Sequence, residues 1–220
     1  MIAVICARSG SKRIKNKNII NFYGKPIISY PIKVAKSHKK ISEVYLSTNS
    51  NRIKKIGIRY GAKVPYLRSN NLSNDKTSLK NVLKDFVKKI EFKNKYVCCI
   101  YPTAALIKKN TISKAYNKIK KTNYDLIVAI KEFESDPSRA LKINRSNLNF
   151  INKYAYNNNK IKEKLYSDAG LFFIFNKNTY FKSKNLPKKT TFIKLQNHEA
   201  VDVNEKKDLE LLKKLFLNRK

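Results

Sequence analysis

Cysteine is scarce in this chain of 220 residues, and its spacing excludes two kinds of site. The three cysteines, Cys6, Cys98 and Cys99, lie within apolar runs and form no C-x-x-C motif. Structural zinc sites and disulfide frameworks need thiols at other spacings or in larger numbers. We therefore expect neither, and we expect free buried thiols in a protein of the reducing cytoplasm.

Acidic side chains are scarce as well, because 15 aspartates and glutamates stand against 49 lysines and arginines, a formal net charge of +34. A basic excess is one signature of proteins that bind nucleic acid or anionic membranes. Here the lysines are spread along the whole chain, and lysine, asparagine and isoleucine share AT-rich codons. Compositional drift explains the charge better, since no stacking-aromatic motif or recognition helix is visible. A nucleic-acid-binding protein remains the alternative from a different functional class.

Long apolar runs and glycine-rich motifs are also missing. The N-terminal apolar run covers residues 2–6, far short of the roughly 18 residues that cross a bilayer. We therefore expect neither a signal peptide nor a membrane partner. The loop after this run contains a single glycine, Gly10, whereas P-loops and dinucleotide-binding fingerprints need several at fixed spacing.

The sequence does contain an alternation of apolar runs and amphipathic helical patterns. Leu79, Val82 and Leu83 begin the clearest helical stripe. Strands are predicted at 2–6, 44–48, 63–67, 95–101, 125–130 and 170–175, and helices at 27–38, 51–60, 78–90, 111–121 and 205–217. This order predicts an α/β fold of three α/β/α layers around a mostly parallel sheet. Such sheets bind ligands at the carboxyl ends of their strands.

The pattern loosens after residue 131, but no linker divides the chain. We predict one domain, residues 1–220, with a β-rich excursion at about 132–169. Within it, residues 141–151 are predicted to form a hairpin with Arg-Ser-Asn as its turn, and residues 152–164 a loop.

Two local signals refine the predicted helices. Pro31 is expected to kink the helix at 27–38, because proline removes one backbone donor. Asp75 or Thr77 is expected to cap the helix at 78–90.

The segment ARSGSKRIKNKN, residues 7–18, leaves the first strand at the edge where ligands bind. Its Ser-Gly-Ser turn can present backbone N–H groups, and Arg8, Lys12, Arg13 and Lys17 surround that turn. Backbone donors combined with guanidinium and ammonium groups suit a polyphosphate. A solvated basic loop is the structural alternative in so lysine-rich a chain. Arg8, one of few arginines, favours anion binding.

The same segment resembles the N-terminal signature of the sugar-activating nucleotidyltransferases. ARSGSKRIKNKNI is followed by FYGKPII, and VYLSTNS, YGAKVPYLRSNNLSND, YPTAAL and AVDVNEKKDLE agree in order along nearly the whole chain. The chain is most similar to the acylneuraminate (CMP-sialic acid) cytidylyltransferases. YVCCIYPTAAL, PSRALKI and YSDAGLFFIF resemble the branch that acts on pseudaminic acid. The resemblance implies a Rossmann-like nucleotidyltransferase fold.

The resemblance also implies a reaction, in which CTP and pseudaminate, a nine-carbon acidic sugar, give CMP-pseudaminate and diphosphate for the synthesis of surface glycans. N-acetylneuraminate, legionaminate or KDO are alternative sugars, because only residues of the sugar pocket separate them. The family further implies Mg²⁺ and a homodimer in which one subunit helps to close the other's sugar site. A sugar-binding scaffold that has lost the chemistry is another alternative.

The resemblance assigns most of the candidate residues to the nucleotide. Arg8, Lys12 and Lys17 match the triphosphate-binding positions, and Lys12 is expected to have the main catalytic role, because cations fixed beforehand stabilise the departing pyrophosphate. The other nucleotide-binding positions are Ala7, Ser9, Gly10, Ser11, Asn18, Arg68, Asp75, Thr77, Tyr101, Pro102 and Thr103.

The remaining candidates concern the metal and the sugar. Asp202 is expected to hold Mg²⁺ with Asn204, which stands where relatives often have a second acid and supplies no charge. The structural alternative is that one of the two caps the last helix. Arg139 is expected to bind the sugar carboxylate and Asp168 to accept hydrogen bonds from hydroxyl groups. Asn49, where relatives commonly carry an acid, is assigned no catalytic role.

Overall fold

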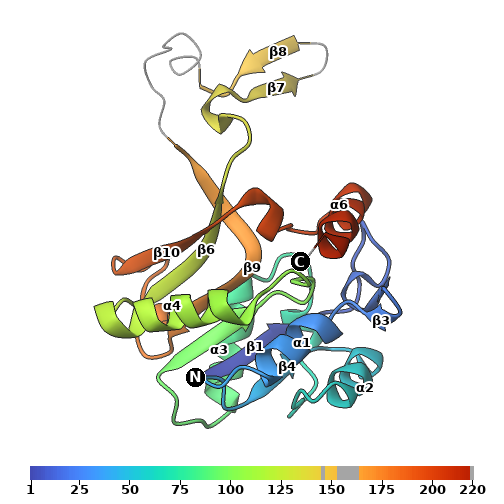
Figure 1. Ribbon diagram of the computed structural model, residues 1–220, viewed down its shortest axis with the longest axis vertical. Coiled ribbons are helices and arrows are strands. Elements are labelled where there is room, and N and C mark those ends of the chain that lie inside the picture. The colour runs from blue at the N-terminus through green and yellow to red at the C-terminus, as the bar shows by residue number, and fades with distance from the viewer. Residues whose placement is uncertain (145–146, 153–163, 219–220) are drawn as a thin grey trace.

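A six-stranded sheet forms the centre of the computed structural model, which describes residues 1–144, 147–152 and 164–218 (Figure 1). The strand order is β10-β6-β9-β5-β1-β4, and only β9 runs antiparallel to its neighbours. The strands are β1 (Ile2–Cys6), β4 (Val44–Ser47), β5 (Tyr96–Ile100), β6 (Leu126–Glu132), β9 (Tyr166–Asn176) and β10 (Thr190–Leu195). The predicted mostly parallel sheet is therefore confirmed.

Helices cover both faces of this sheet (Figure 1). One face packs against α1 (Ser29–Lys36), α2 (Asn51–Arg59) and α4 (Lys109–Thr122). The other packs against α3 (Leu79–Lys89). The last helix, α6 (Lys206–Leu217), packs with the segments that follow β1 and β5. This arrangement confirms the three α/β/α layers. No helix within the described ranges is long and apolar enough to cross a membrane.

Two of the strand predictions need correction. Residues 63–67 form no strand, because only isolated bridges join Lys63 to Tyr45 and Leu67 to Thr48. The edge strand β10 was not predicted, although its sequence TTFIKL contains the β-branched residues that favour strands. Strand β9 is also longer than the predicted 170–175, because it continues N-terminally as far as Tyr166 beside β6.

Two expectations about helix ends are also wrong. Pro31 lies in the first turn of α1, where backbone N–H groups have no intrahelical partner, so it interrupts no helix hydrogen bond. The N-cap of α3 is Ser78, whose hydroxyl accepts a hydrogen bond from the Asn81 N–H at 3.2 Å. Asp75 and Thr77 precede this residue and do not cap the helix.

Two small antiparallel sheets complete the fold. β2 (Asn21–Phe22) and β3 (Lys25–Pro26) pair in the segment before α1. β7 (Leu141–Asn144) and β8 (Asn147–Phe150) form the predicted hairpin, which extends away from the central sheet (Figure 1). Two residues of the predicted turn, 145–146, and most of the predicted loop, 153–163, lie outside the described residues.

Candidate nucleotide-binding active site

A cavity of about 340 Å³ opens where β1 and β5 end. The loop after β1, the segment before α3, the turn after β5 and the segment before α6 all contribute to it. It brings together most of the predicted nucleotide-binding residues, namely Arg8, Ser11, Asn18, Arg68, Asp75, Thr77, Tyr101, Pro102 and Thr103. Lys17, Asp202 and Asn204 line it as well. The sheet edge chosen from the sequence is therefore where the candidate residues meet.

Lys12 lies in an adjoining cavity of about 240 Å³. Arg13 lines the same space, and Arg8, Ser11 and Lys17 belong to both cavities. The basic loop after β1 therefore carries its cations along one continuous opening. Ala7, Ser9 and Gly10, which were also assigned to the nucleotide, belong to this loop without lining either cavity.

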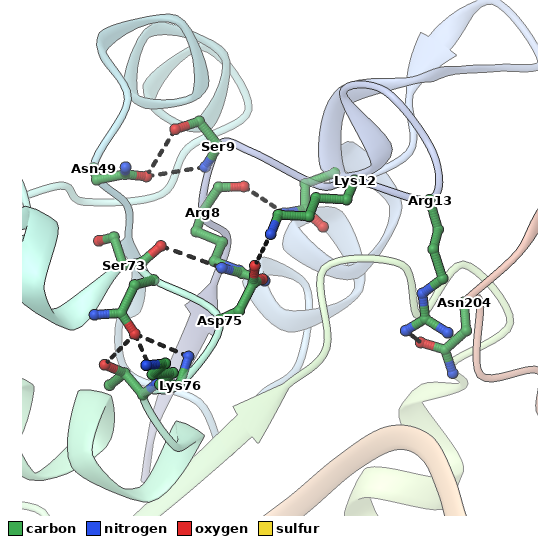
Figure 2. Close-up of polar contacts among 12 residues, drawn as sticks. Arg8, Ser9, Lys12, Arg13, Asn49, Ser73, Asp75, Lys76 and Asn204 are labelled. Carbon is green, nitrogen blue, oxygen red and sulfur yellow. Dashed lines mark hydrogen bonds and ion pairs between the residues drawn. The ribbon is translucent and has the colours of Figure 1, made fainter.

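The backbone of the loop is fixed from two sides. The Ala7 N–H donates to the Ser47 carbonyl oxygen at 3.0 Å, which continues the pairing of β1 with β4. The Ser9 N–H and hydroxyl both donate to Asn49 Oδ1, at 2.9 and 3.3 Å (Figure 2). Asn49 therefore positions the loop. Its place just after β4 was the signal in the sequence, because strand ends meet at this edge.

Asn18 joins the loop to the cavity. Its Nδ2 donates to the Arg8 carbonyl oxygen at 2.9 Å. Its Oδ1 is buried and has no hydrogen-bond partner among the described residues. A buried acceptor without a donor costs free energy of about 1–3 kcal/mol. An N–H or O–H group of a ligand in the cavity would remove that cost.

Asp75 neutralises two of the loop's cations (Figure 2). Its carboxylate accepts a hydrogen bond from the Arg8 guanidinium and forms an ion pair with Lys12 at 2.8 Å. These two donors, Lys12 first, lower the pKa of Asp75 to about 2, so the carboxylate stays ionised through the physiological range. The Asp75 carboxylate therefore lies between the two cations assigned to the triphosphate.

Replacing Asp75 with asparagine should strengthen the binding of pyrophosphate. The substitution removes an anion that competes for Arg8 and Lys12, and exposed ion pairs of this kind are weak. We expect the dissociation constant, measured by calorimetry, to fall about 2- to 10-fold. Glu43→Gln removes a carboxylate paired with Lys63 elsewhere and controls for net charge. Weaker pyrophosphate binding in Asp75→Asn would contradict the competition.

Arg68 supplies a buried positive charge to the same cavity. Its side chain is only 5% exposed. Its Nε donates to Ser73 Oγ at 3.0 Å, and its Nη1 donates to Ser47 Oγ at 3.3 Å. Burial lowers the pKa of Arg68 from its ordinary value. Since these partners are neutral hydroxyl groups, the charge is left available to an anionic or carbonyl group of a ligand.

Lys17 joins the basic loop to the segment before α6. Its Nζ donates to the Val203 carbonyl oxygen at 2.7 Å. Burial lowers the pKa of Lys17, while nearby Asp202 opposes this shift. The loop and the Asp202 segment, more than 180 positions apart in the sequence, are thereby held at one site.

The residues around Asp202 fit a metal ion that is held mainly by the phosphate groups of a bound nucleotide. Asn204 Nδ2 donates to Asp202 Oδ2 at 2.7 Å. Asn204 Oδ1 accepts from Arg13 at 3.3 Å (Figure 2). No group of three potential His, Cys, Asp or Glu ligands occurs in the described ranges. Mg²⁺ commonly uses one or two carboxylates together with substrate phosphates and water. A single carboxylate beside a phosphate loop fits that pattern.

Neither Asp202 nor Asn204 caps α6, so that structural alternative is wrong. The N-cap is Glu205, which forms a capping box with Asp208. The backbone N–H groups of Asn204 and Glu205 donate to Asp208 Oδ2, at 2.8 and 2.7 Å. The Asp202 carboxylate is not needed for the helix.

Asp168 lies where β9 bulges. Between the pairs Val128–Phe173 and Ile130–Asp168, β9 contains several more residues than β6. Asp168 accepts hydrogen bonds from the Gly170 N–H at 2.8 Å and from the Tyr101 hydroxyl at 3.1 Å. Burial raises the pKa of Asp168, although these hydrogen bonds oppose the shift.

The bulge also brings the backbone of Gly170 into close contact with Asp202, the residue expected to hold the metal. Gly170 has φ +66°, and a Cβ placed on it would lie 2.5 Å from the Asp202 Cβ. Only a residue without a side chain allows this approach. Gly170 therefore sets the position of Asp202.

The structure places Arg139 apart from these residues. It ends a short 3₁₀ helix, Pro137–Arg139, between β6 and the β7–β8 hairpin. It lines neither the nucleotide cavity nor the cavity beside Asp168. Its role toward the sugar carboxylate stays a prediction.

Several residues that shape the cavity had no signal in the sequence. Asn74 Oδ1 accepts from the backbone N–H groups of Lys76 and Thr77, both at 2.9 Å, and so holds the loop before α3 (Figure 2). The lining not foreseen consists of Cys6, Leu72, Asn74, Leu79 and Val82. Cys6 ends β1, Leu72 ends the short 3₁₀ helix Asn70–Leu72, and Leu79 and Val82 belong to α3. An apolar side chain at such positions is ordinarily read as core.

Comparison with known proteins agrees with this geometry. A family model described as cytidylyltransferase matches residues 2–219. The chain is 34% identical over 222 residues to the pseudaminic acid cytidylyltransferase of Campylobacter jejuni, covering 98% of this chain and 95% of that protein. It is 31% identical over 175 residues, 79% of this chain and 34% of the relative, to the Helicobacter pylori protein named pseudaminic acid cytidylyltransferase and UDP-2,4-diacetamido-2,4,6-trideoxy-beta-L-altropyranose hydrolase. The CMP-N,N'-diacetyllegionaminic acid synthase of Legionella pneumophila is 28% identical over 224 residues, 98% of this chain and 96% of that protein.

A solved structure shows the same fold. The structure of CMP:2-keto-3-deoxy-manno-octonic acid synthetase complexed with CTP aligns with a TM-score of 0.74 and 14% identity, covering 100% of this chain and 99% of that one. The nucleotidyltransferase fold predicted from the sequence is thus confirmed. Because a family model matches nearly the whole chain and a relative above 30% identity covers almost all of it, this chain belongs to the cytidylyltransferase family.

Proposed function

We propose that the protein transfers CMP from CTP to pseudaminate and releases diphosphate. The observation that carries this proposal is the cavity at the strand ends, where a basic loop, a buried arginine and the carboxylates of Asp75 and Asp202 converge. Relatives named pseudaminic acid cytidylyltransferase cover nearly the whole chain and support the choice of sugar. Their identity of 33–34% exceeds the 29% of an N-acylneuraminate cytidylyltransferase of Escherichia coli that matches 96% of this chain, and this difference favours pseudaminate over N-acetylneuraminate.

The chain's own residues act by positioning and by neutralising charge. The oxygen of the sugar's anomeric hydroxyl forms a bond to the α-phosphorus, and its proton passes to solvent. The bond from that phosphorus to the oxygen that bridges the α- and β-phosphates breaks, and this oxygen leaves as part of pyrophosphate. Arg8, Lys12 and Lys17 neutralise the negative charge that gathers on the leaving group. Asn18 Oδ1 accepts a hydrogen bond from the nucleoside. Tyr101, Pro102 and Thr103 line the space for the base and ribose.

Mg²⁺ belongs to the same proposal. Asp202 would hold it, with Asn204 nearby, and the metal would supply positive charge to the phosphate oxygens. Because Asn204 contributes no charge, the site depends on the phosphates for most of its ligands. Bound in this way, the metal arrives with the nucleotide.

The identity of the sugar is tested by turnover. The chain is incubated with CTP, Mg²⁺ and, separately, pseudaminate, N,N'-diacetyllegionaminate, N-acetylneuraminate and KDO, and released pyrophosphate is measured. We expect the highest kcat/KM for pseudaminate. A preference for another acid would overturn the choice of sugar. Steep salt-dependent binding to duplex DNA without any pyrophosphate release would instead favour the nucleic-acid alternative.

We also propose a homodimer formed through the β7–β8 hairpin. The pairs Leu141–Phe150 and Ile143–Leu148 place four apolar side chains on one face of this ribbon. Ile143 is 74% exposed and Leu148 is 61% exposed. A two-stranded ribbon is marginally stable by itself, so a second copy of the chain would cover this face. The excursion at 132–169 would then serve both assembly and the sugar site.

Charge placed on the apolar face of the hairpin tests the dimer. Ile143→Lys should shift sedimentation toward the monomer, because the new ammonium group would lose hydration in the interface. Asn149→Lys adds the same charge on the opposite face of the ribbon and is the matched control. Equal sedimentation of both variants and the unmodified chain would contradict this interface.

We also propose that the protein works in the cytoplasm, because CTP is supplied there.

A further inference from the structure

A second cavity, of about 530 Å³, lies beside the nucleotide cavity and shares the side chains of Leu79 and Tyr101 with it. Its floor is the face of the sheet opposite α4, where β6, β9 and β10 contribute Val128, Phe173 and Phe192. We call this cavity the apolar groove. It is larger than the nucleotide cavity that it adjoins.

The lining of the groove is chemically unlike that of the nucleotide cavity. Among the described residues, no lysine, arginine or glutamate lines it. Its polar side chains are Ser167, Asp168, Thr190 and Thr191, together with the hydroxyl groups of Tyr101, Tyr166 and Tyr180. Phe192 is 50% exposed and Leu186, which also lines the groove, is 68% exposed. Large apolar side chains gathered at a concave surface mark a place where a ligand removes them from water.

The boundary between the two cavities is polar. Tyr101 borders both of them, and its hydroxyl donates to Asp168 Oδ2 at 3.1 Å. Asp168 lines the groove, while Asp202 lines the nucleotide cavity. A sugar whose anomeric hydroxyl reaches the α-phosphorus therefore lies at this boundary, and the rest of its carbon chain extends into one of the adjoining spaces.

Resting on the proposed function, we propose that the apolar groove binds the acetamido- and methyl-bearing half of the sugar acid, and that Val128 and Phe192 set the preference for it. Pseudaminate has two acetamido groups and a terminal methyl group, whereas N-acetylneuraminate has one acetamido group and more hydroxyl groups. Methyl groups gain from leaving water in the groove. Hydroxyl groups placed against Val128 and Phe192 would lose hydration without gaining a partner from these two side chains. We place the sugar carboxylate on the side of the basic loop, whose cations line both adjoining cavities.

Selectivity between the two sugars is the direct measurement. Val128→Thr keeps the shape of the side chain and adds a hydroxyl group, and Phe192→Ser removes a half-exposed ring. In each variant we expect kcat/KM for pseudaminate to fall about 10- to 100-fold, and kcat/KM for N-acetylneuraminate to change less than about threefold. The KM for CTP should stay unchanged, which also shows that the variant is folded. Ile58→Thr, at an exposed apolar position of α2, is the matched control.

The outcomes separate this inference from the function on which it rests. An unchanged ratio of the two kcat/KM values in both variants, with an active unmodified chain, would overturn the groove assignment alone. So would a shift in sedimentation with unchanged selectivity, because the groove would then be a contact between subunits. Failure of the unmodified chain to release pyrophosphate with any sugar acid would overturn the proposed function and this inference together.

Discussion

Replacing Lys12 with alanine is expected to lower kcat/KM for CTP about 100- to 1,000-fold, the usual effect of removing one preorganised group that stabilises developing charge. Lys12 lines the basic opening, and among the described residues its ion pair is with Asp75, at 2.8 Å. A departing pyrophosphate would take the place of the Asp75 carboxylate beside Lys12. Because the charge develops as the bond breaks, the loss should fall mainly on kcat.

Lys15 offers a matched control within the same loop. It is exposed and lines neither cavity of the site, so Lys15→Ala removes the same charge without removing a phosphate contact. We expect its turnover to stay within about twofold of the unmodified chain, since exposed charges contribute little when they are screened. Equal losses in the two variants would show that the loop acts through its overall charge. No loss in Lys12→Ala would remove the catalytic assignment of this residue.

Gly170→Ala is expected to abolish most turnover and to destabilise the fold. A residue with a side chain at φ +66° is strained by about 1–2 kcal/mol. The new Cβ would also lie 2.5 Å from the Asp202 Cβ and 2.8 Å from its Cα. Overpacking of this kind costs about 1–3 kcal/mol, and here it displaces the one carboxylate proposed for the metal. Thermal unfolding and pyrophosphate release are the two measurements.

Gly24→Ala separates backbone strain from the contact. Gly24 has φ +76°, and a Cβ placed there would meet nothing within 4 Å. This variant should show the strain alone, about 1–2 kcal/mol of unfolding free energy, with normal turnover. If Gly170→Ala were no more destabilised than Gly24→Ala and kept its activity, Gly170 would not be responsible for positioning Asp202.

The sequence pointed to this edge of the sheet because its signals are local. Arg8, Lys12 and Lys17 follow an apolar run directly, and the ends of parallel strands meet at one edge, so strand order is not needed to bring these residues to the strand-end cavities. The turn after β5 was found by the same argument. Segments along the chain that resemble motifs of the cytidylyltransferases then indicated the family.

Other features depend on contacts between distant segments and could not be predicted. The link from Lys17 to Val203 spans the whole chain, and the approach of Gly170 to Asp202 needs both a bulge in β9 and the segment before α6. Residues 63–67 have the composition of a strand, but they make only isolated bridges beside β4. Local composition indicates only a preference for strand structure, and a strand forms where a neighbouring strand is available for pairing.

A structure of the protein with CTP and Mg²⁺ tests the central claim most directly. The account predicts that the triphosphate lies along residues 8–17, where it replaces the Asp75 carboxylate beside Arg8 and Lys12, with the base and ribose against Tyr101–Thr103. A nucleotide bound elsewhere on the chain, with Arg8 and Lys12 still paired to Asp75 and with Asn18 Oδ1 still lacking a donor, would contradict it.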